Sequence, residues 1–327
     1  MTSRYRLTVG DPDPSSVRRL TFVAFLPDGR CLAVPDDAGV RLPTGVVRDG
    51  EHYLLDTALR VPLEEAAFRR QRVHPFAADG THIYAWLDGD RYAGRRPHAT
   101  IEPTTGTAED IASQLEESGR PADARAALDG ARSFRTQSDV DYYADNLRLI
   151  EPAYLRGATP WEGSGLGGDA ARWRAHREPI VDGIHRDGTF LDLGCANGLL
   201  MESVHSWAAE RGLAVEPYGV DIAPRLVDLA RRRLPQWANR IEVGNAIDYR
   251  APDNRRFTFV HTLLDSVPVH RRGDLIRHTR TLVEPAGRLL VSHYPAEGGT
   301  DRTAPEHVRR LGFRLAGQST MTAWIDA

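Results

Sequence analysis

Short apolar runs alternate with amphipathic stretches of helical length from residue 175 to the end of the sequence. The runs that predict strands lie at residues 190–193, 217–221, 240–243, 257–262, 287–293, 313–318 and 321–325. Helical periodicity separates the first six runs, which is typical of βαβ units and a parallel sheet. About two residues separate the last two runs, and so short a gap predicts a hairpin. We therefore expect an α/β domain whose Rossmann-like, mostly parallel seven-stranded sheet closes with an antiparallel hairpin.

The first half of the chain has a different pattern. Apolar runs at residues 21–27, 31–35 and 82–88 are bounded by turn-forming residues and predict strands, whereas residues 56–72 predict one helix. The pattern is helical from Thr107 onward. Gly119 ends one predicted helix, and Glu151-Pro152 weakens or ends another that starts at residue 139. These shifts predict an α+β domain over residues 1–105, a helical connector and active-site lid over residues 106–174, and the α/β domain over residues 175–327.

The composition excludes several chemistries. All 42 lysine-plus-arginine positions are arginine, so the chain has no lysine. A Schiff-base enzyme, a pyridoxal-phosphate enzyme and a Walker-type phosphate loop each need a lysine and are therefore excluded. The formal net charge of -3 argues against a general nucleic-acid binder, which usually carries a strong basic excess.

Other sequence features bear on compartment and partners. The sequence has no apolar run of the length of a membrane-spanning helix, and its first residues lack the pattern of a signal peptide. Its two cysteines, Cys31 and Cys195, build no disulfide framework. We therefore expect a cytoplasmic protein with no metal site and no membrane partner, and we consider a homodimer.

The most informative segment is a turn between a predicted strand and a predicted helix. It reads FLDLGCANGLL over residues 190–200 and contains Asp192, Gly194, Ala196 and Gly198. Glycines at such a turn let the backbone approach a ligand and open the helix N-terminus toward it. The spacing Gly194-x-x-x-Gly198 lacks the middle glycine of a dinucleotide fingerprint. The turn therefore suits a nucleoside better than a dinucleotide.

Two further polar positions follow the next two predicted strands. Asp221 ends the strand at residues 217–221 and lies 23 residues after Gly198. A carboxylate at that place can accept two hydrogen bonds from a ribose diol. Asn245 follows the third strand, where it is placed to contact an adenine or its ribose edge, and Asp248 is a nearby alternative. The three segments together predict a nucleoside site at the carboxyl ends of the strands.

These segments resemble the class I S-adenosylmethionine-dependent methyltransferases over about residues 175–327. The later stretches FTFVHTLL, VEPAGRLLVSHY and LGFRLAG extend the resemblance. It implies that S-adenosylmethionine is the cofactor and that these residues hold it: Asp192, Gly194, Ala196, Gly198, Asp221, Ile222, Asn245 and Ala246. Two of them depart from the family pattern, because Ala196 replaces the usual middle glycine and Asn245 stands where the family more often has aspartate.

The acceptor of the methyl group needs alignment with the activated sulfonium and, if it is a hydroxyl, a base. Candidates for that base or for the wall of the acceptor site follow the fourth and fifth strands, at His261, Thr262, Asp265, His293 and Tyr294. His293 is the first choice for the base because it ends a strand and titrates near neutrality. Each of these residues has the alternative role of a wall residue.

The segment before the α/β domain has the composition of a lid. Its aromatic and polar residues near the glycine-rich stretch at residues 161–169 are Tyr142, Tyr143, Asn146, Tyr154 and Trp161. Arg172, Trp173 and Arg177 follow on the next predicted helix, where they either extend the lid or leave the arginines in solvent. No NPPY or DPPY run typical of nucleic-acid amino-methylating enzymes occurs. The sequence therefore favours a small-molecule acceptor.

The N-terminal stretch resembles a degenerate Nudix box. The residues that keep the spacing at the two ends of that box are Gly45, Glu51, Arg60, Glu64, Glu65 and Phe68. The middle is one residue too long, Val61 replaces a glutamate and Ala67 replaces a glycine. In Nudix hydrolases such glutamates hold magnesium, and adjacent carboxylates suit a hard cation. The loss of one carboxylate is expected to weaken or remove that metal site.

Three functions remain open from the sequence. The expected one is transfer of a methyl group from S-adenosylmethionine to oxygen or nitrogen of a small molecule, as in natural-product biosynthesis. A Nudix-type nucleoside diphosphate hydrolase would use the N-terminal half instead. A sensor without catalytic activity would bind the cofactor and a partner.

Overall fold

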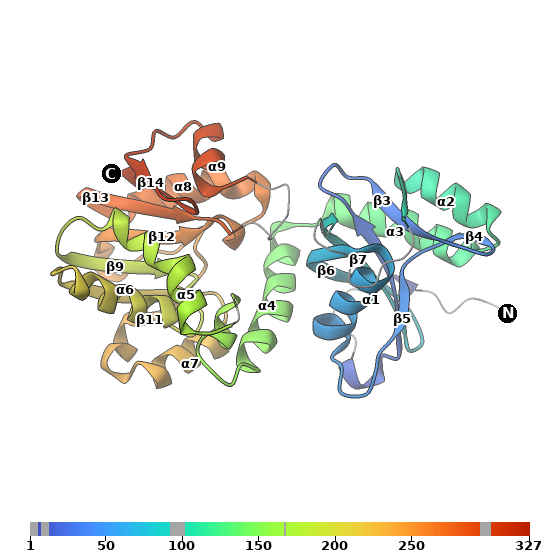
Figure 1. Cartoon of the computed structure of the whole chain (residues 1–327), viewed down its shortest axis with the longest axis horizontal. Helices are drawn as coiled ribbons and strands as arrows, with labels where there is room; N and C mark the ends of the chain where they lie inside the picture. Colours follow the sequence, from blue (N-terminus) through green and yellow to red (C-terminus); the bar gives the residue numbers. More distant parts are fainter. Residues whose placement is uncertain (1–5, 8–12, 92–101, 167, 295–301) are drawn as a thin grey trace. The chain divides into compact units, whose positions relative to one another are not determined.

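The computed structural model describes residues 6–7, 13–91, 102–166, 168–294 and 302–327. The chain forms two compact units, one that ends at Asp141 and one that begins at Tyr142. Figure 1 labels the elements of both, and each unit is described by itself. Among the described helices, none is long and apolar enough to cross a membrane.

Unit 2, from Tyr142 onward, contains the predicted seven-stranded sheet. Its strands are β9 (Gly188–Leu193), β10 (Val215–Asp221), β11 (Ile241–Val243), β12 (Phe257–Leu263), β13 (Val283–Ser292), β14 (Gly317–Gln318) and β15 (Thr322–Asp326). Their order in the sheet is β11-β10-β9-β12-β13-β15-β14. The first five pair in parallel, whereas β15 runs antiparallel to both β13 and β14. The mostly parallel sheet and its closing hairpin are therefore confirmed, with β14 shorter than expected.

Helices cover both faces of this sheet (Figure 1). They are α5 (Ala170–Arg177), α6 (Leu199–Glu210), α7 (Pro224–Arg233), α8 (Arg272–Thr281) and α9 (Ala304–Arg310). Phe190 of β9 packs in one apolar cluster with Trp207 of α6, while the next residue, Leu191, packs in another with Ile276 of α8. Side chains alternate between the two faces of a strand, so a strand covered on both faces is apolar throughout. This explains why the strands of unit 2 appear in the sequence as short continuous apolar runs.

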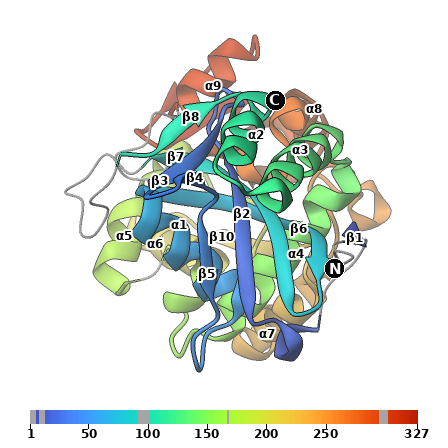
Figure 2. The ribbon, with the colours of Figure 1, turned by 90° about the vertical axis from the view of Figure 1, so that its right-hand side faces the viewer.

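Unit 1 contains a second sheet, which is mainly antiparallel (Figure 2). Its strands are β1 (Arg6–Leu7), β2 (Arg19–Phe25), β3 (Cys31–Asp36), β4 (Gly39–Arg41), β5 (Thr44–Val46), β6 (Phe68–Asp79), β7 (His82–Arg91) and β8 (Thr104–Gly106). The main order is β1-β6-β7-β2-β3-β4, with β5 paired to β2 and β8 paired to β3. The neighbours β2 and β7 pair in parallel. An α+β unit was expected here, and the three predicted strands are present as β2, β3 and β7.

The helices expected in a connector belong to unit 1. They are α2 (Ala108–Glu117) and α3 (Pro121–Thr136). Helix α2 begins after Thr107, as the sequence indicated, and the structure shows a capping box between Thr107 and Asp110. Ile111 and Leu115 of α2 lie in one buried cluster with Trp86 of β7. The structure divides into two compact units near residue 141, whereas the sequence predicted boundaries at residues 105 and 174. The reason is that the apolar face of each helix is buried on the sheet.

The prediction of a single helix over residues 56–72 is wrong. A five-residue π-helical turn, Tyr53–Thr57, leads into α1 (Ala58–Ala66), and Ala67 then takes a left-handed conformation with φ 48°. The chain continues as β6 from Phe68, paired along its length with β7. Pairing with a later strand decides the conformation of residues 68–72, and the local pattern does not contain that information.

Helix α4 (Asp139–Leu155) also differs from expectation, because it continues past Pro152 for almost one further turn. A proline inside a helix removes one backbone hydrogen bond but leaves the following turn able to form. The extension determines the position of Tyr154, which belongs to the candidate site described next.

Candidate functional site

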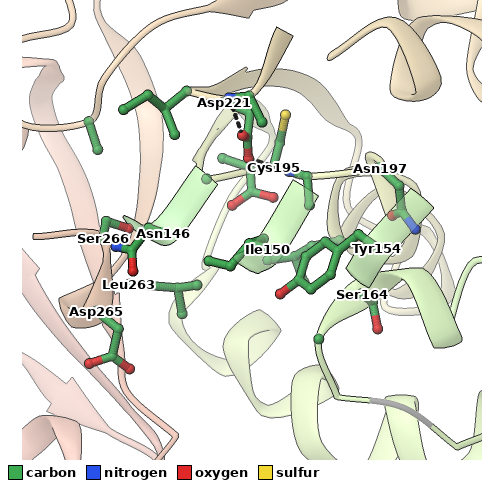
Figure 3. Close-up of a pocket in the computed structure, with 18 of the residues that line it drawn as sticks. Asn146, Ile150, Tyr154, Ser164, Cys195, Asn197, Asp221, Leu263, Asp265 and Ser266 are labelled. Carbon is green, nitrogen blue, oxygen red and sulfur yellow. Dashed lines mark hydrogen bonds between the residues drawn. The ribbon is translucent and has the colours of Figure 1, made fainter. Parts of the chain in front are cut away.

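A cavity of about 300 Å³ lies at the carboxyl ends of the parallel strands of unit 2. Its walls come from residues that follow β9, β10, β11, β12 and β13, and from α4 and α5. Figure 3 shows Asp265 and Ser266 on one side of the cavity and Tyr154 and Ser164 on the other. Ligands of open α/β sheets bind outside this end of the strands. The cavity is therefore the candidate functional site.

Most of the residues predicted from the sequence meet in this cavity. Those that line it are Asp192, Gly194, Ala196, Asp221, Ile222, Asn245, Ala246, His261, Asp265, Tyr143, Asn146, Tyr154 and Tyr294. Several residues named from the sequence are absent from its lining: Gly198, His293, Trp161, Tyr142, Arg172, Asp248 and Thr262. Gly198 supports the turn, His293 lies behind Asp265, and Trp161 packs against the apolar cluster that includes Trp173 and Leu200.

The glycine-containing turn connects β9 to α6 as predicted. Gly194 and Gly198 both have positive φ, at 93° and 78°, and Gly198 is the residue that precedes α6. A Cβ on Gly198 would lie 2.6 Å from Leu234 Cδ1, so this position excludes a side chain through contact as well as through conformation. A Cβ on Gly194 would meet nothing closer than Ser266 Oγ at 3.6 Å. Gly194 therefore leaves open space on the cavity side.

Asp221 is the last residue of β10, and its carboxylate accepts a hydrogen bond from the turn between β9 and α6. Its Oδ2 accepts a hydrogen bond from the Ala196 N–H at 2.7 Å, and its Oδ1 accepts one from the Ala223 N–H at 2.8 Å (Figure 3). Burial raises the pKa of Asp221 to about 6, against the effect of these two backbone hydrogen bonds. The sequence indicated a ligand-binding carboxylate here but not its hydrogen bond to the turn, which needs Ala196 at a left-handed φ of 46°.

The third strand contributes the wall opposite the turn. Asn245 and Ala246 follow β11 and line the cavity together with Ile222, which follows β10. The Asn245 carbonyl accepts the Tyr249 N–H at 2.8 Å, and its side-chain Oδ1 accepts the Ile247 N–H at 3.3 Å. Among the described residues, the side-chain amide nitrogen of Asn245 has no acceptor. Mixed apolar and amide character of this kind suits a heterocyclic base.

Four buried polar side chains form a chain of hydrogen bonds across the sheet. Asp192 Oδ1 lies 2.8 Å from His261 Nδ1, and His261 Nε2 lies 3.0 Å from Ser292 Oγ. Ser292 Oγ in turn lies 2.8 Å from Thr322 Oγ1. Because both ring nitrogens of His261 are engaged, this arrangement favours a positioning role for His261 over the catalytic role expected from the sequence. The imidazole fixes the orientation of the Asp192 carboxylate at the cavity.

Asp265 and His293 form a second pair of a carboxylate and an imidazole, after Asp192 and His261. Asp265 Oδ2 lies 3.0 Å from His293 Nδ1, and Asp265 Oδ1 accepts a hydrogen bond from Arg272 at 2.9 Å. The Asp265 side chain is 53% exposed and lines the cavity, whereas that of His293 is 4% exposed. Asp265 thus separates His293, the base expected from the sequence, from the cavity. Of this pair, Asp265 is the group that a ligand in the cavity would contact.

Helix α4 forms part of the cavity wall along most of its length. Tyr143, Asn146 and Tyr154 all line the cavity from this helix. Burial of the hydroxyl raises the pKa of Tyr154 to about 12, and the nearby charge of Asp221 acts in the same direction. A Cβ on Gly165 would collide with the Tyr154 hydroxyl, so the glycine-rich segment packs directly on this tyrosine.

Asn197 is a residue of the site that the sequence analysis missed. It is 2% exposed, and its amide nitrogen donates to the Pro160 carbonyl at 2.8 Å and to the Gly163 carbonyl at 2.7 Å. Its Oδ1 accepts the Leu199 N–H at 3.0 Å. Asn197 therefore joins the glycine-rich segment to the first turn of α6. The available signal was an amide residue directly before the glycine that opens a helix.

The glutamates of the predicted Nudix box lie in unit 1 against arginines. Arg60 contacts Glu51 at 2.6 Å and Glu64 at 3.3 Å, and Arg41 contacts Glu65 at 2.8 Å. The hydrogen bond from Arg60 is the main reason why the pKa of Glu51 falls to about 2. Within the described residues, no group of three histidine, cysteine or acidic side chains is arranged to hold a metal ion. The carboxylates are thus neutralised by ion pairs.

Comparisons with known proteins give matches among solved structures. No family model matches the chain, and no curated protein matches it. The N-methyltransferase NodS from Bradyrhizobium japonicum WM9, in complex with S-adenosyl-L-homocysteine, is similar at 15% identity over 57% of this chain and 97% of its own, with a TM-score of 0.41. Magnesium protoporphyrin IX methyltransferase from Synechocystis PCC 6803, with bound S-adenosylmethionine, is 16% identical over 58% and 97%, with a TM-score of 0.39. A methyltransferase from Aquifex aeolicus is 15% identical over 48% and 94%, with a TM-score of 0.36.

Proposed function

We propose that unit 2 is an S-adenosylmethionine-dependent methyltransferase domain that acts on a small molecule. The observation that supports this most is the hydrogen bond between Asp221, at the end of β10, and the glycine-containing turn at the end of β9. The two strands are neighbours in a sheet that closes with the antiparallel pair β14–β15. This closing pair distinguishes the sheet from a plain doubly wound sheet and agrees with the resemblance to class I methyltransferases.

The residues at the cavity fit that cofactor. Each carboxylate oxygen of Asp221 accepts one backbone hydrogen bond and has a further lone pair, so the carboxylate retains capacity for two ribose hydroxyls. Ile222 and Ala246 supply apolar contact beside Asn245, which suits adenine. The open side of Gly194 leaves room for the amino-acid end near Asp192. No lysine or metal is required by this arrangement.

The bound cofactor supplies a methyl group on a positively charged sulfur, which needs an aligned acceptor rather than further activation. Asp265 is placed to bind the acceptor, because its half-exposed carboxylate lies on the cavity side opposite Tyr154 (Figure 3). For a hydroxyl or ammonium acceptor, Asp265 accepts the proton in a pair with His293, whose Nδ1 lies 3.0 Å away. Leu263 and Ile150 add apolar side chains to the lining of the same cavity.

The test is a calorimetric titration with S-adenosylhomocysteine. Wild type is expected to bind in the micromolar range, and Asp221→Ala is expected to lose about a hundredfold in affinity, since hydrogen bonds to a charged group contribute about 2–3 kcal/mol. Asp228→Ala, an exposed carboxylate on the neighbouring α7, is the matched control. No binding to wild type would contradict the proposal.

A panel of small acceptors separates an enzyme from a sensor. Methyl transfer from S-adenosylmethionine to a phenol, carboxylate or amine in the panel supports the enzyme. Tight cofactor binding without turnover on any acceptor class supports the sensor instead. Asp265 favours the enzyme, because a half-exposed carboxylate held by both Arg272 and His293 is an arrangement suited to proton transfer.

For unit 1 we infer a Nudix-like domain without hydrolase activity. The predicted box begins in β5, its Arg60, Glu64 and Glu65 lie on α1, and the left-handed Ala67 stands where the box has glycine. These positions support the resemblance, while the ion pairs of the glutamates argue against magnesium binding. Binding or scaffolding is the role that remains for such a domain.

A further inference from the structure

Arg177, the last residue of α5, lines the cavity of unit 2 and is half-buried. Its Nη1 atom is buried and has no hydrogen-bond partner among the described residues. Arg177 is the only arginine among the described residues that line the cavity. A buried donor on a charged group is unfavourable unless a partner satisfies it. Because the described residues supply no acceptor here, the position suits one that a ligand brings.

Aromatic rings hold the guanidinium in place. Its central carbon lies 3.4 Å from the ring centroid of Tyr294, which follows β13, and 5.2 Å from that of Trp173, one turn earlier on α5. Stacking on aromatic faces leaves the planar N–H groups of an arginine free to donate at its edge. The hydroxyl of Tyr294 is also buried and has no hydrogen-bond partner in the described ranges. Two donors without partners thus lie side by side at one wall of the cavity.

The carboxylates that line the cavity are bonded elsewhere. Asp192 is engaged by His261, Asp221 by two backbone N–H groups, and Asp265 by Arg272 and His293. None of the described acidic residues forms an ion pair with Arg177. The positive charge of Arg177 therefore has no counter-ion within the part of the chain that the structure describes, although three acidic side chains share its cavity.

We propose that Arg177 and Tyr294 form a carboxylate-binding subsite of this cavity. The planar fork of a guanidinium matches a carboxylate with two parallel hydrogen bonds. The Tyr294 hydroxyl donates a third. This inference rests on the proposed methyltransferase function, within which a carboxylate has two sources. One is the amino-acid end of the cofactor, and the other is an acid group on the methyl acceptor.

The experiment compares ligands that differ in this one group. S-adenosylhomocysteine has the carboxylate, whereas 5′-methylthioadenosine shares the nucleoside and thioether without it. Both are titrated into wild type and into Arg177→Met, Arg177→Lys and Arg172→Met. Arg172 lies exposed on the same helix and does not line the cavity, so Arg172→Met is the matched control. Benzoate, a small carboxylate, is titrated into each protein with and without saturating S-adenosylhomocysteine.

Two results support the subsite and identify its source. A roughly 10- to 100-fold loss of S-adenosylhomocysteine affinity in Arg177→Met, with methylthioadenosine unaffected, assigns the subsite to the cofactor. A similar loss of benzoate binding to the loaded protein, with S-adenosylhomocysteine unaffected, assigns it to the acceptor. In either case Arg177→Lys is expected to bind more tightly than Arg177→Met and more weakly than wild type, because lysine retains the positive charge but not the planar pair of N–H donors. A role limited to packing predicts no such recovery.

Other results overturn the subsite. Equal losses for S-adenosylhomocysteine and methylthioadenosine would mean that the cavity itself has changed. Unchanged binding of all three ligands in Arg177→Met would mean that the guanidinium meets no carboxylate. If wild type binds neither nucleoside, the methyltransferase proposal fails, and the benzoate titration without S-adenosylhomocysteine still decides whether Arg177 binds a carboxylate.

Discussion

The carboxylate of Asp221 accepts a hydrogen bond from the backbone N–H of Ala196 at 2.7 Å. This contact joins the end of β10 to the turn after β9, and it depends on the left-handed backbone of Ala196 at φ 46°. The acid that is expected to bind the ribose is thus the same group that fixes the turn expected to hold the methionine part. Any change in its protonation affects both halves of the candidate cofactor site.

The affinity for S-adenosylhomocysteine is expected to depend on pH through Asp221. Burial raises the pKa of this carboxyl to about 6, so the ligand-free protein is protonated there below that pH. The ribose hydroxyls bind best to the ionised form, which means that binding releases a proton below pH 6. The affinity should be constant above about pH 7 and fall by up to about tenfold per pH unit below 6. Calorimetry between pH 5 and 8 measures this dependence.

Asp221→Asn serves as the control for that pH dependence. The amide cannot titrate, so the variant should bind more weakly at pH 7.5 and show a flat profile from pH 5 to 8. A wild-type profile that is equally flat would contradict the assignment. A variant that keeps the same slope would trace the titration to another group.

The strands of unit 2 and the position of Asp221 were accessible from the sequence because both have local signals. A strand covered on both faces is a continuous apolar run, and an acid at the end of such a run is visible without a structure. The strand β6 was not accessible, since its partner β7 decides its conformation. Asn197 was missed for a related reason, because its partners lie at residues 160 and 163 in a segment without periodicity.

The roles of His261 and His293 show the same limit within the site. His261 lies near the end of β12 and His293 directly follows β13, so the sequence places both near the acceptor. Which ring nitrogen is engaged, and whether a side chain reaches the cavity, depend on neighbours in other strands. Ser292 of β13 occupies one nitrogen of His261, and Asp265 stands between His293 and the cavity.

Asp265→Asn is expected to separate methyl transfer from cofactor binding. With a hydroxyl acceptor, turnover should fall roughly 100- to 10,000-fold, the usual contribution of a general base. The dissociation constant of S-adenosylhomocysteine should change little, because Asp221 and the turn are untouched. Asp274→Asn, an acid on α8 that pairs with Arg271 and Arg277, is the control. Equal losses of turnover and cofactor affinity would assign Asp265 to cofactor binding.

Gly198→Ala and Gly212→Ala form a matched pair for stability. Both glycines have nearly the same backbone conformation, with φ 78° at Gly198 and 76° at Gly212. Gly198 precedes α6, and Gly212 follows it. A Cβ on Gly212 meets nothing within 4 Å, whereas one on Gly198 lies 2.6 Å from Leu234 Cδ1. Each change should lower the free energy of unfolding by about 1 kcal/mol because of the left-handed backbone. Gly198→Ala should lower it by about 1–3 kcal/mol more because of overpacking. Urea unfolding of the full chain tests this, and equal losses would contradict it.

Magnesium is expected to have no effect on unit 1. Arg60 bonds both Glu51 and Glu64, and Arg41 bonds Glu65, so a divalent cation would have to displace two arginines to reach the carboxylates. The low pKa of Glu51, about 2, shows how strongly Arg60 stabilises its charge. Millimolar magnesium should therefore leave the unfolding temperature unchanged, and phosphate release from nucleoside diphosphates should stay at background. Magnesium-dependent release that disappears in Glu64→Gln would instead establish unit 1 as a hydrolase.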